Sequence, residues 1–237
     1  MRKPSPPDPA LDALAARAHD ADLADDAAEA KAAFHLRMRA RGIQDIRVLR
    51  AFELVPRQAF VPHRYLDLAQ RDLALPIGCG QTLPEPWLVA RLIEAAKIER
   101  KHRVLEIGAG TGYATAILSH LAADVISLER YQSLAIAAQA RLEAQGIENA
   151  AVVWGDGLAL PASLDPVDRI IAHGLVDPVP DSLTDRLAEG GILVCARPAA
   201  VGQAVTRVAK GPDGALAWTA LGPCQLQALQ PGLAATL

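Results

Sequence analysis

The sequence predicts a three-layer, doubly wound α/β fold whose central sheet is mostly parallel. From residue 103 onward, short apolar runs rich in β-branched residues alternate with helix-forming stretches, as in successive strand and helix units. The last two runs, residues 203–210 and 215–221, flank a Gly-Pro-Asp-Gly turn and predict a C-terminal antiparallel hairpin. Helical periodicity before residue 100 predicts N-terminal helices that precede the sheet.

The 237 residues suit one large α/β domain with a smaller extension. We expect a disordered tail and an Ala-rich helical extension over 1–32, and N-terminal helices with an irregular loop over 33–100. The sheet domain is expected over 101–222, and a C-terminal tail over 223–237.

The composition argues against several kinds of partner. A net charge of −3 and a pI near 6.1 give no basic field for nucleic acid or an anionic membrane. Cys79, Cys195 and Cys224 are too few and too scattered for a disulfide framework, and no Cys/His cluster suggests a metal. The N-terminus has prolines and acids where a signal peptide has an apolar core. We therefore expect a cytoplasmic monomer without metal, nucleic acid or membrane.

The elements before residue 100 follow from capping and periodicity. Residues 11–41 favour one or two helices, and Gly42 fits the left-handed position that ends them. Asp45 can cap a helix over 46–55, where apolar residues recur at helical spacing. Prolines and glycines break residues 73–87 into an irregular segment, which we expect to cover a ligand site, and helical periodicity resumes over 88–98.

Residues 103–113, RVLEIGAGTGY, predict a buried strand, a turn with Gly108, Gly110 and Gly112, and a helix start. Such a turn exposes backbone amides at the positive end of a helix and suits a nucleotide-like ligand. Glu106 adds a carboxylate on the strand. Glu129 ends the next apolar run, where an acid can bind a ribose diol. The alternative is a turn that only joins strand to helix.

The rest of the chain continues the alternation. We expect a helix over 114–121, a strand over 124–129, a helix over 133–145 ended by Gly146, and a strand over 151–154. Asp156 and Gly157 follow that strand on the ligand side of the sheet. Asp156 can accept a hydrogen bond from an adenine amino group, or it is an ordinary turn aspartate.

The fourth strand is expected over 168–172, followed by a helix that Asp181 or Ser182 caps and that ends at residues 190–191. A fifth strand is expected over 192–196. The C-terminal CQLQALQPGLAATL shows no functional pattern.

The order E-I-G-A-G-T-G differs from the G-x-G-x-x-G of dinucleotide sites and resembles the first motif of S-adenosylmethionine-dependent methyltransferases. A more specific resemblance joins it to segments that precede it. Over residues 33–197 the chain resembles the protein-L-isoaspartate O-methyltransferase family, on the segments Arg41-Gly42-Ile43, Val55-Pro56-Arg57, Phe60-Val61-Pro62, Leu75-Pro76-Ile77-Gly78, Gly80-Gln81-Thr82 and Leu105-Glu106-Ile107-Gly108.

The resemblance implies a Rossmann-like methyltransferase sheet and methyl transfer from S-adenosylmethionine to the α-carboxylate of L-isoaspartyl residues in damaged proteins, a repair reaction. A carboxylate is ionised at pH 7, since its ordinary pKa is near 4, so the chemistry needs orientation and no general base. The cofactor-binding residues that we predict are Gln81, Thr82, Glu106, Gly108, Gly110, Gly112, Glu129, Asp156 and Gly157.

Two departures from the family pattern concern the acceptor, and they define the predicted catalytic set Thr82, Pro84 and His173. The family loop reads G-Q-T-I-S with an active-site serine, and Pro84 occupies that position here. Pro84 has no hydroxyl and no backbone donor. If the serine only positions the acceptor, Thr82 and nearby amides can replace it in a slower enzyme. If the serine is essential, the substrate has changed.

The second departure follows the fourth strand, where the family has small residues such as T-A-A and this chain has Ala172-His173-Gly174-Leu175. His173 is expected beside the transferred methyl group. It can bind an acceptor carboxylate when protonated, act as a base for a hydroxyl or amine acceptor, or bond to the backbone as a structural residue.

Three functions therefore remain open on the sequence. The first is an isoaspartyl methyltransferase with weakened activity. The second is a methyltransferase on another acceptor that uses His173. The third is a cofactor-binding module without catalysis, whose loop recognises a partner.

Overall fold

The computed structural model describes residues 32–234, and the chain divides into two compact units, Met1–Gln44 and Asp45–Leu237. The expectations for residues 1–31 lie outside the described residues, and the four-part division of the chain stays a prediction.

Residues 32–40 of the first unit are helical. Gly42 has a φ of 95°, and its N–H donates to Arg39 O at 2.9 Å. Ile43 N–H donates to Met38 O at 3.1 Å, so this end is a Schellman motif and the predicted stop at Gly42 is confirmed.

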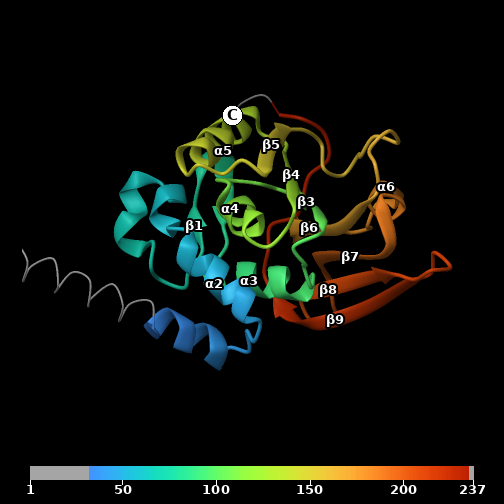
Figure 1. Ribbon diagram of the computed structural model, residues 1–237, viewed down its shortest axis with the longest axis horizontal. Coiled ribbons are helices and arrows are strands. Elements are labelled where there is room, and N and C mark those ends of the chain that lie inside the picture. Colours follow the sequence, from blue (N-terminus) through green and yellow to red (C-terminus); the bar gives the residue numbers. More distant parts are fainter. Residues whose placement is uncertain (1–31, 235–237) are drawn as a thin grey trace, which may run out of the picture. The chain divides into compact units, whose positions relative to one another are not determined.

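A seven-stranded sheet forms the centre of the second unit (Figure 1), in the order β5-β4-β3-β6-β7-β8-β9. Neighbouring strands from β5 to β7 pair in parallel, and β8 and β9 are antiparallel, which confirms the predicted sheet and hairpin. The strands are β3 Arg103–Ile107, β4 Asp124–Glu129, β5 Ala150–Trp154, β6 Val167–Leu175, β7 Leu187–Pro198, β8 Gln203–Lys210 and β9 Leu216–Cys224.

The order of the strands reverses between β3 and β6. The chain winds outward from β3 through β4 to β5 and then returns to β6 on the other side of β3. Parallel strands that wind in opposite directions from one point leave a crevice at their carboxyl ends. The glycine turn after β3 and the residues that end β6 therefore face one site.

Helices flank the sheet and precede it along the chain. Asp45 caps α2 as predicted, because its carboxylate accepts from Arg47 N–H. The irregular loop contains a two-stranded antiparallel sheet in which Leu75 pairs with Leu83. The remaining elements are α2 Ile46–Leu54, η1 Arg57–Phe60, η2 His63–Leu68, β1 Leu75–Pro76, η3 Gly78–Gly80, β2 Thr82–Leu83, α3 Pro86–Ala95, α4 Tyr113–Ser119, α5 Gln132–Ala144 and α6 Asp181–Asp185.

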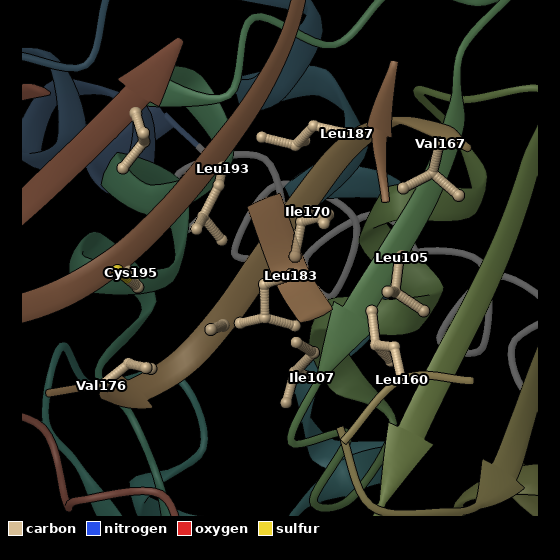
Figure 2. Packing of buried hydrophobic residues seen from close by; sticks show 12 residues of the cluster. Leu105, Ile107, Leu160, Val167, Ile170, Val176, Leu183, Leu187, Leu193 and Cys195 are labelled. Atoms are coloured by element: carbon tan, nitrogen blue, oxygen red, sulfur yellow. The ribbon is translucent and has the colours of Figure 1, made fainter. Parts of the chain in front are cut away.

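One face of the sheet packs on α6 (Figure 2). Leu183 of α6 is fully buried and lies beside Ile170 of β6, in a cluster that includes Leu105 and Ile107 of β3. Because side chains alternate along a strand, Glu106 projects to the opposite face, toward α4. The alternation of β3 thus places aliphatic side chains in this cluster and a carboxylate on the other side.

The predictions for residues 181–191 are partly wrong. The N-cap of α6 is Pro180, without a side-chain cap, and the helix ends at Asp185 instead of continuing to the glycine pair. Strand β7 begins at Leu187 and runs through Gly190 and Gly191. The pairing with β6 shifts there, and Gly190 has a φ of 70°, so the glycines form an irregularity inside a strand.

Candidate active site

A cavity of about 630 Å³ opens at the carboxyl ends of the central strands, at the reversal of strand order. Its size is in the range of sites for small ligands, about 300–1,000 Å³. Most of the predicted site residues line it. They are Gln81, Thr82, Pro84, Gly108, Gly110, Glu129, Asp156, Gly157 and His173.

The other two predicted residues, Glu106 and Gly112, are not in the wall of this cavity. Gly112 precedes α4 with a φ of 86°, and a Cβ there would lie 3.2 Å from Ala138 Cβ of α5. The close approach of two helices accounts for this glycine. Glu106 is fully buried beneath the cavity.

The glycine turn is joined to Glu129 at the end of β4. Gly110 has a φ of 56°, and its N–H donates to Glu129 Oε2 at 2.9 Å. Tyr131 N–H donates to Glu129 Oε1 at 3.0 Å. Two backbone donors thus fix the carboxylate, and each oxygen keeps a lone pair that can accept from a hydroxyl group. This geometry suits the diol that the sequence assigned to Glu129.

Thr111 contributes an unsatisfied polar atom to the same wall. It lines the cavity, and its Oγ1 is buried without a hydrogen-bond partner within residues 32–234. A buried hydroxyl without a partner is uncommon and is explained where a ligand completes the site.

Asp156 follows β5, and its carboxylate accepts two backbone hydrogen bonds. Its Oδ1 accepts from Leu158 N–H at 2.9 Å, and its Oδ2 accepts from Gly232 N–H at 2.6 Å. The neighbouring Gly157 is packed on β3, because a Cβ there would lie 2.3 Å from Ile107 Cγ2. Gly157 therefore lets the segment that carries Asp156 approach the central strand.

Glu106 of β3 and His173 of β6 form a buried pair on neighbouring strands. Glu106 Oε2 accepts from the hydroxyls of Thr115 and Ser127, each at 2.5 Å. Its Oε1 lies 2.9 Å from His173 Nε2, although the two atoms are not aligned as a hydrogen bond. The His173 side chain is 6% exposed, and the residue also lines the cavity. Nε2 thus lies beside Glu106, and the residue contributes to the wall of the cavity.

The loop from Ile77 to Glu85, which we call the acceptor loop, forms the opposite wall. Gln81 Nε2 donates to Cys79 O at 3.1 Å and to the Tyr131 hydroxyl at 3.4 Å, so this side chain ties the loop to the start of α5. Thr82 is exposed and pairs with Pro76 in the small sheet.

Arg57 anchors the far end of the acceptor loop. Its guanidinium is buried and donates to four carbonyls, those of Pro84, Ala69, Arg71 and Leu73, at 3.0–3.1 Å. Its Cζ also lies 5.8 Å from the centre of the Tyr113 ring. Arg57 is part of the Val-Pro-Arg resemblance, but no role could be predicted for it, because its four partners are backbone carbonyls, which every residue carries.

Two further parts of the site were missed in the sequence. Tyr131 lines the cavity and bonds to Gln81, and residues Gln225 to Gln230 form part of the wall. The C-terminal segment is thus more than the tail expected over 223–237. Residues 225–234 consist of Gln, Leu, Ala, Pro and Gly, none of which is charged or nucleophilic, so the composition could not identify this part of the wall.

The family model of protein-L-isoaspartate(D-aspartate) O-methyltransferase matches residues 29–229, which is most of the chain. The chain belongs to this family. Among its relatives, the protein-L-isoaspartate O-methyltransferase of Xanthobacter autotrophicus is 45% identical over 208 residues, covering 86% of this chain and 94% of the relative. That of Azorhizobium caulinodans is 47% identical over 164 residues, covering 69% and 76%.

Solved structures agree with the family at the level of the fold. One named protein-L-isoaspartate O-methyltransferase superposes with a TM-score of 0.74 at 26% identity, covering 86% of this chain and 67% of that one. A putative protein-L-isoaspartate O-methyltransferase from Plasmodium falciparum, solved with S-adenosyl-L-homocysteine, superposes with a TM-score of 0.72 at 20% identity, covering 84% and 97%.

No helix within residues 32–234 is long and apolar enough to cross a membrane. No group of three or more His, Cys, Asp or Glu side chains in that part of the chain is arranged to hold a metal ion.

Proposed function

We propose that this chain transfers a methyl group from S-adenosylmethionine to the α-carboxylate of L-isoaspartyl residues in damaged proteins. Membership of the protein-L-isoaspartate O-methyltransferase family supports the reaction. The structural observation that supports it is a single cavity. The glycine turn, Glu129, His173 and the acceptor loop all contribute to its wall.

The residues of the cavity fit the cofactor. We propose that Glu129, fixed by backbone donors, binds the ribose diol and that Asp156 accepts from the adenine amino group. Thr111 Oγ1, a buried hydroxyl without a partner within residues 32–234, is a further candidate for contact with the cofactor. When bound, the cofactor supplies an electrophilic methyl group on a sulfonium. The side chains of Ile77, Leu128 and Leu229 give the cavity apolar walls, which would exclude water from a bound cofactor.

The acceptor side works by orientation. An isoaspartyl carboxylate is already a nucleophile at pH 7 and needs no base. The acceptor loop has to hold this carboxylate in line with the methyl group. Intramolecular reactions whose reacting groups are well aligned are strongly accelerated, so alignment alone can supply much of the catalysis. Arg57 keeps the carbonyl of Pro84 in place at 3.1 Å, and the backbone of the loop is thereby fixed without the family's serine.

We propose that His173, together with the acceptor loop, binds the carboxylate that accepts the methyl group. The residue lines the cavity, and its Nε2 lies 2.9 Å from Glu106 Oε1. In its protonated form it offers a positive charge to the incoming carboxylate, and the buried Glu106 balances that charge. A His173→Thr change, which restores a small family residue, is expected to raise KM for an isoaspartyl peptide. The affinity for S-adenosylhomocysteine should stay unchanged.

The same pair favours a second candidate function. A carboxylate that orients a histidine is the arrangement by which enzymes activate hydroxyl or amine nucleophiles. In that case the chain methylates another acceptor and His173 takes its proton. Loss of kcat in His173→Thr, with KM unchanged and without isoaspartyl activity in the wild type, would favour this reading.

Labelled S-adenosylmethionine tests the proposal. The purified protein is incubated with an isoaspartyl peptide beside the same peptide with an ordinary aspartate. We expect base-labile label on the isoaspartyl peptide alone. Cofactor binding without transfer to either peptide would refute the proposed reaction and favour a binding module. Pro84→Ser is the companion variant, and it should increase the rate if the acceptor reaches this part of the loop.

A Gly110→Val change tests the cofactor half separately. Gly110 has a left-handed φ, and a Cβ would lie 3.3 Å from Ile77 Cδ1 at the cavity wall, so valine is both strained and in the way. We expect loss of S-adenosylhomocysteine binding by calorimetry, and a normal affinity would refute the assignment.

We further propose that the protein acts as a monomer in the cytoplasm, with damaged proteins as partners and without nucleic acid or a membrane. The net charge of −3 and the scattered, unpaired cysteines support this. Light scattering of the purified chain would show a larger mass if the monomer assignment is wrong.

A further inference from the structure

The chain crosses the carboxyl edge of the sheet after β9, and we call residues 225–234 the C-terminal strap. Its first part, Gln225 to Gln230, lines the cavity. The strap ends beside the start of α5, where Ala234 pairs with Tyr131. The family match ends at Leu229, so the end of the strap lies beyond it.

The strap is first attached at the end of β6. Leu175 N–H donates to Gln227 O at 2.8 Å, and Leu229 N–H donates to Leu175 O at 2.9 Å. The approach depends on Gly174, because a Cβ there would lie 2.5 Å from Leu229 Cγ and 2.9 Å from Gln227 O. Gly174 follows His173 directly, so the strap packs against the residue next to the acceptor site.

A second attachment reaches the acceptor loop. Gln227 Nε2 donates to Gly80 O at 3.1 Å. The same residue accepts from β6 through its backbone, so one residue links the acceptor loop to the strand that carries His173.

The third attachment is on the cofactor side. Gly232 N–H donates to Asp156 Oδ2 at 2.6 Å, and Arg130 Nε donates to Gly232 O at 3.1 Å. Ala234 N–H donates to Arg130 O at 2.8 Å, and Gln132 N–H donates to Ala234 O at 3.0 Å. The strap thus bonds to the carboxylate proposed for adenine and to the residue after Glu129.

We propose that the C-terminal strap is a positioning element of the methyl-transfer site, which holds Asp156 and the acceptor loop in place and must detach from Asp156 before the cofactor leaves. The inference rests on the proposed function of the cavity. Leu226 is buried and Leu229 packs against the core, so the first part of the strap stays attached. Residues 231–233 at its end are exposed, and backbone bonds with little buried apolar surface open locally at low cost. The end of the strap, which carries the bond to Asp156, can therefore open while the sheet stays folded.

Two truncated chains test the strap without relying on activity. A chain that ends at Gln230 lacks Gly232 and Ala234, and a chain that ends at Ala234 keeps every contact above and serves as the control. We expect S-adenosylhomocysteine to dissociate about tenfold faster or more from the shorter chain in stopped-flow measurements, since a hydrogen bond to a charged group is lost. The control should match the full chain. Equal rates for both truncations would overturn the proposal.

Hydrogen exchange gives a second readout on the full chain. The amides of Gly232 and Ala234 should exchange more slowly with S-adenosylhomocysteine bound, and unchanged exchange would overturn the coupling to the cofactor. Gly174→Ala introduces the methyl group that contacts Leu229, and we expect it to accelerate dissociation as the truncation does. If that variant does not fold, the truncations decide.

The outcomes separate the two proposals. A full chain that binds S-adenosylhomocysteine but leaves isoaspartyl peptides unmethylated refutes the reaction and leaves the strap to be judged by its dissociation rates. A full chain that does not bind the cofactor refutes both.

Discussion

Replacing Arg57 should destabilise the protein and loosen the acceptor loop. The guanidinium donates four hydrogen bonds to carbonyls, one of them fully buried at Ala69 O and three partly accessible to water. Hydrogen bonds to a charged group contribute about 1.5–3 kcal/mol each, but the cost of burying the cation, several kcal/mol, offsets much of the sum. In Arg57→Met this cost disappears, and the carbonyls lose their donors.

We estimate a net loss of about 3 kcal/mol, because leaving one buried acceptor unsatisfied costs about 1–3 kcal/mol and the three others can be partly hydrated. For a chain of this length that corresponds to a fall in melting temperature of roughly 6–12 °C. Arg57→Lys is the matched variant. It keeps the charge, but an ammonium lacks the planar fork that reaches four carbonyls, so an intermediate loss is expected.

Calorimetric melting and steady-state kinetics test this together. Because Arg57 holds Pro84, the KM for an isoaspartyl peptide should rise in both variants, while S-adenosylhomocysteine affinity at a temperature where both are folded should not change. A melting temperature of Arg57→Met within about 2 °C of the wild type would refute the estimate. An equal loss of cofactor and peptide affinity would show that Arg57 supports the whole fold instead of the loop.

Three other predictions concern stability and reactivity. Burial and a nearby arginine lower the pKa of His102 from its ordinary 6.5, so the unfolded chain binds a proton first, and the free energy of unfolding should decline as the pH falls below about 6.5. His102→Gln should flatten that decline in melts across pH. Burial raises the pKa of Cys195 to about 12, so a thiol reagent should modify the partly exposed Cys79 in the native protein and Cys195 only after unfolding; early loss of the Cys195 thiol would contradict this. Gly157→Ala should lower stability and cofactor affinity more than Gly155→Ala, since the new methyl would lie 2.3 Å from a neighbouring side chain in the first case and 3.1 Å in the second.

Local patterns in the sequence predicted much of the fold. The strand, turn and helix around Gly108 to Gly112 and the helix end at Gly42 depend on residues adjacent in the chain, so their composition sufficed. The prediction for the segment after Asp181 was wrong because it also relied only on residues adjacent in the chain. A glycine pair after helix-forming residues indicates a helix end, and only the pairing of β7 with β6 shows that Gly190 and Gly191 interrupt a strand.

The parts of the site that consist of charged side chains could be predicted from the sequence. The parts that consist of backbone hydrogen bonds could not. Glu129 ends β4 and Asp156 follows β5, so their position along the chain was enough to predict that both line the site. The contact of His173 with Glu106 depends on the register of β6 against β3, which pairs Ile171 with Glu106 and puts the histidine two residues beyond on the same face. The contacts of the strap are mostly backbone bonds from Gly232 and its neighbours, for which residue identity holds no information.

The position of the transferred methyl group tests the central claim most directly. An isoaspartyl peptide is incubated with the protein and S-adenosylmethionine, and tandem mass spectrometry locates the added methyl group. We predict a single methyl ester on the α-carboxylate of the isoaspartyl residue and none on the aspartyl control peptide. A methyl group on a hydroxyl, an amine or the ordinary aspartate would contradict the assignment of the acceptor.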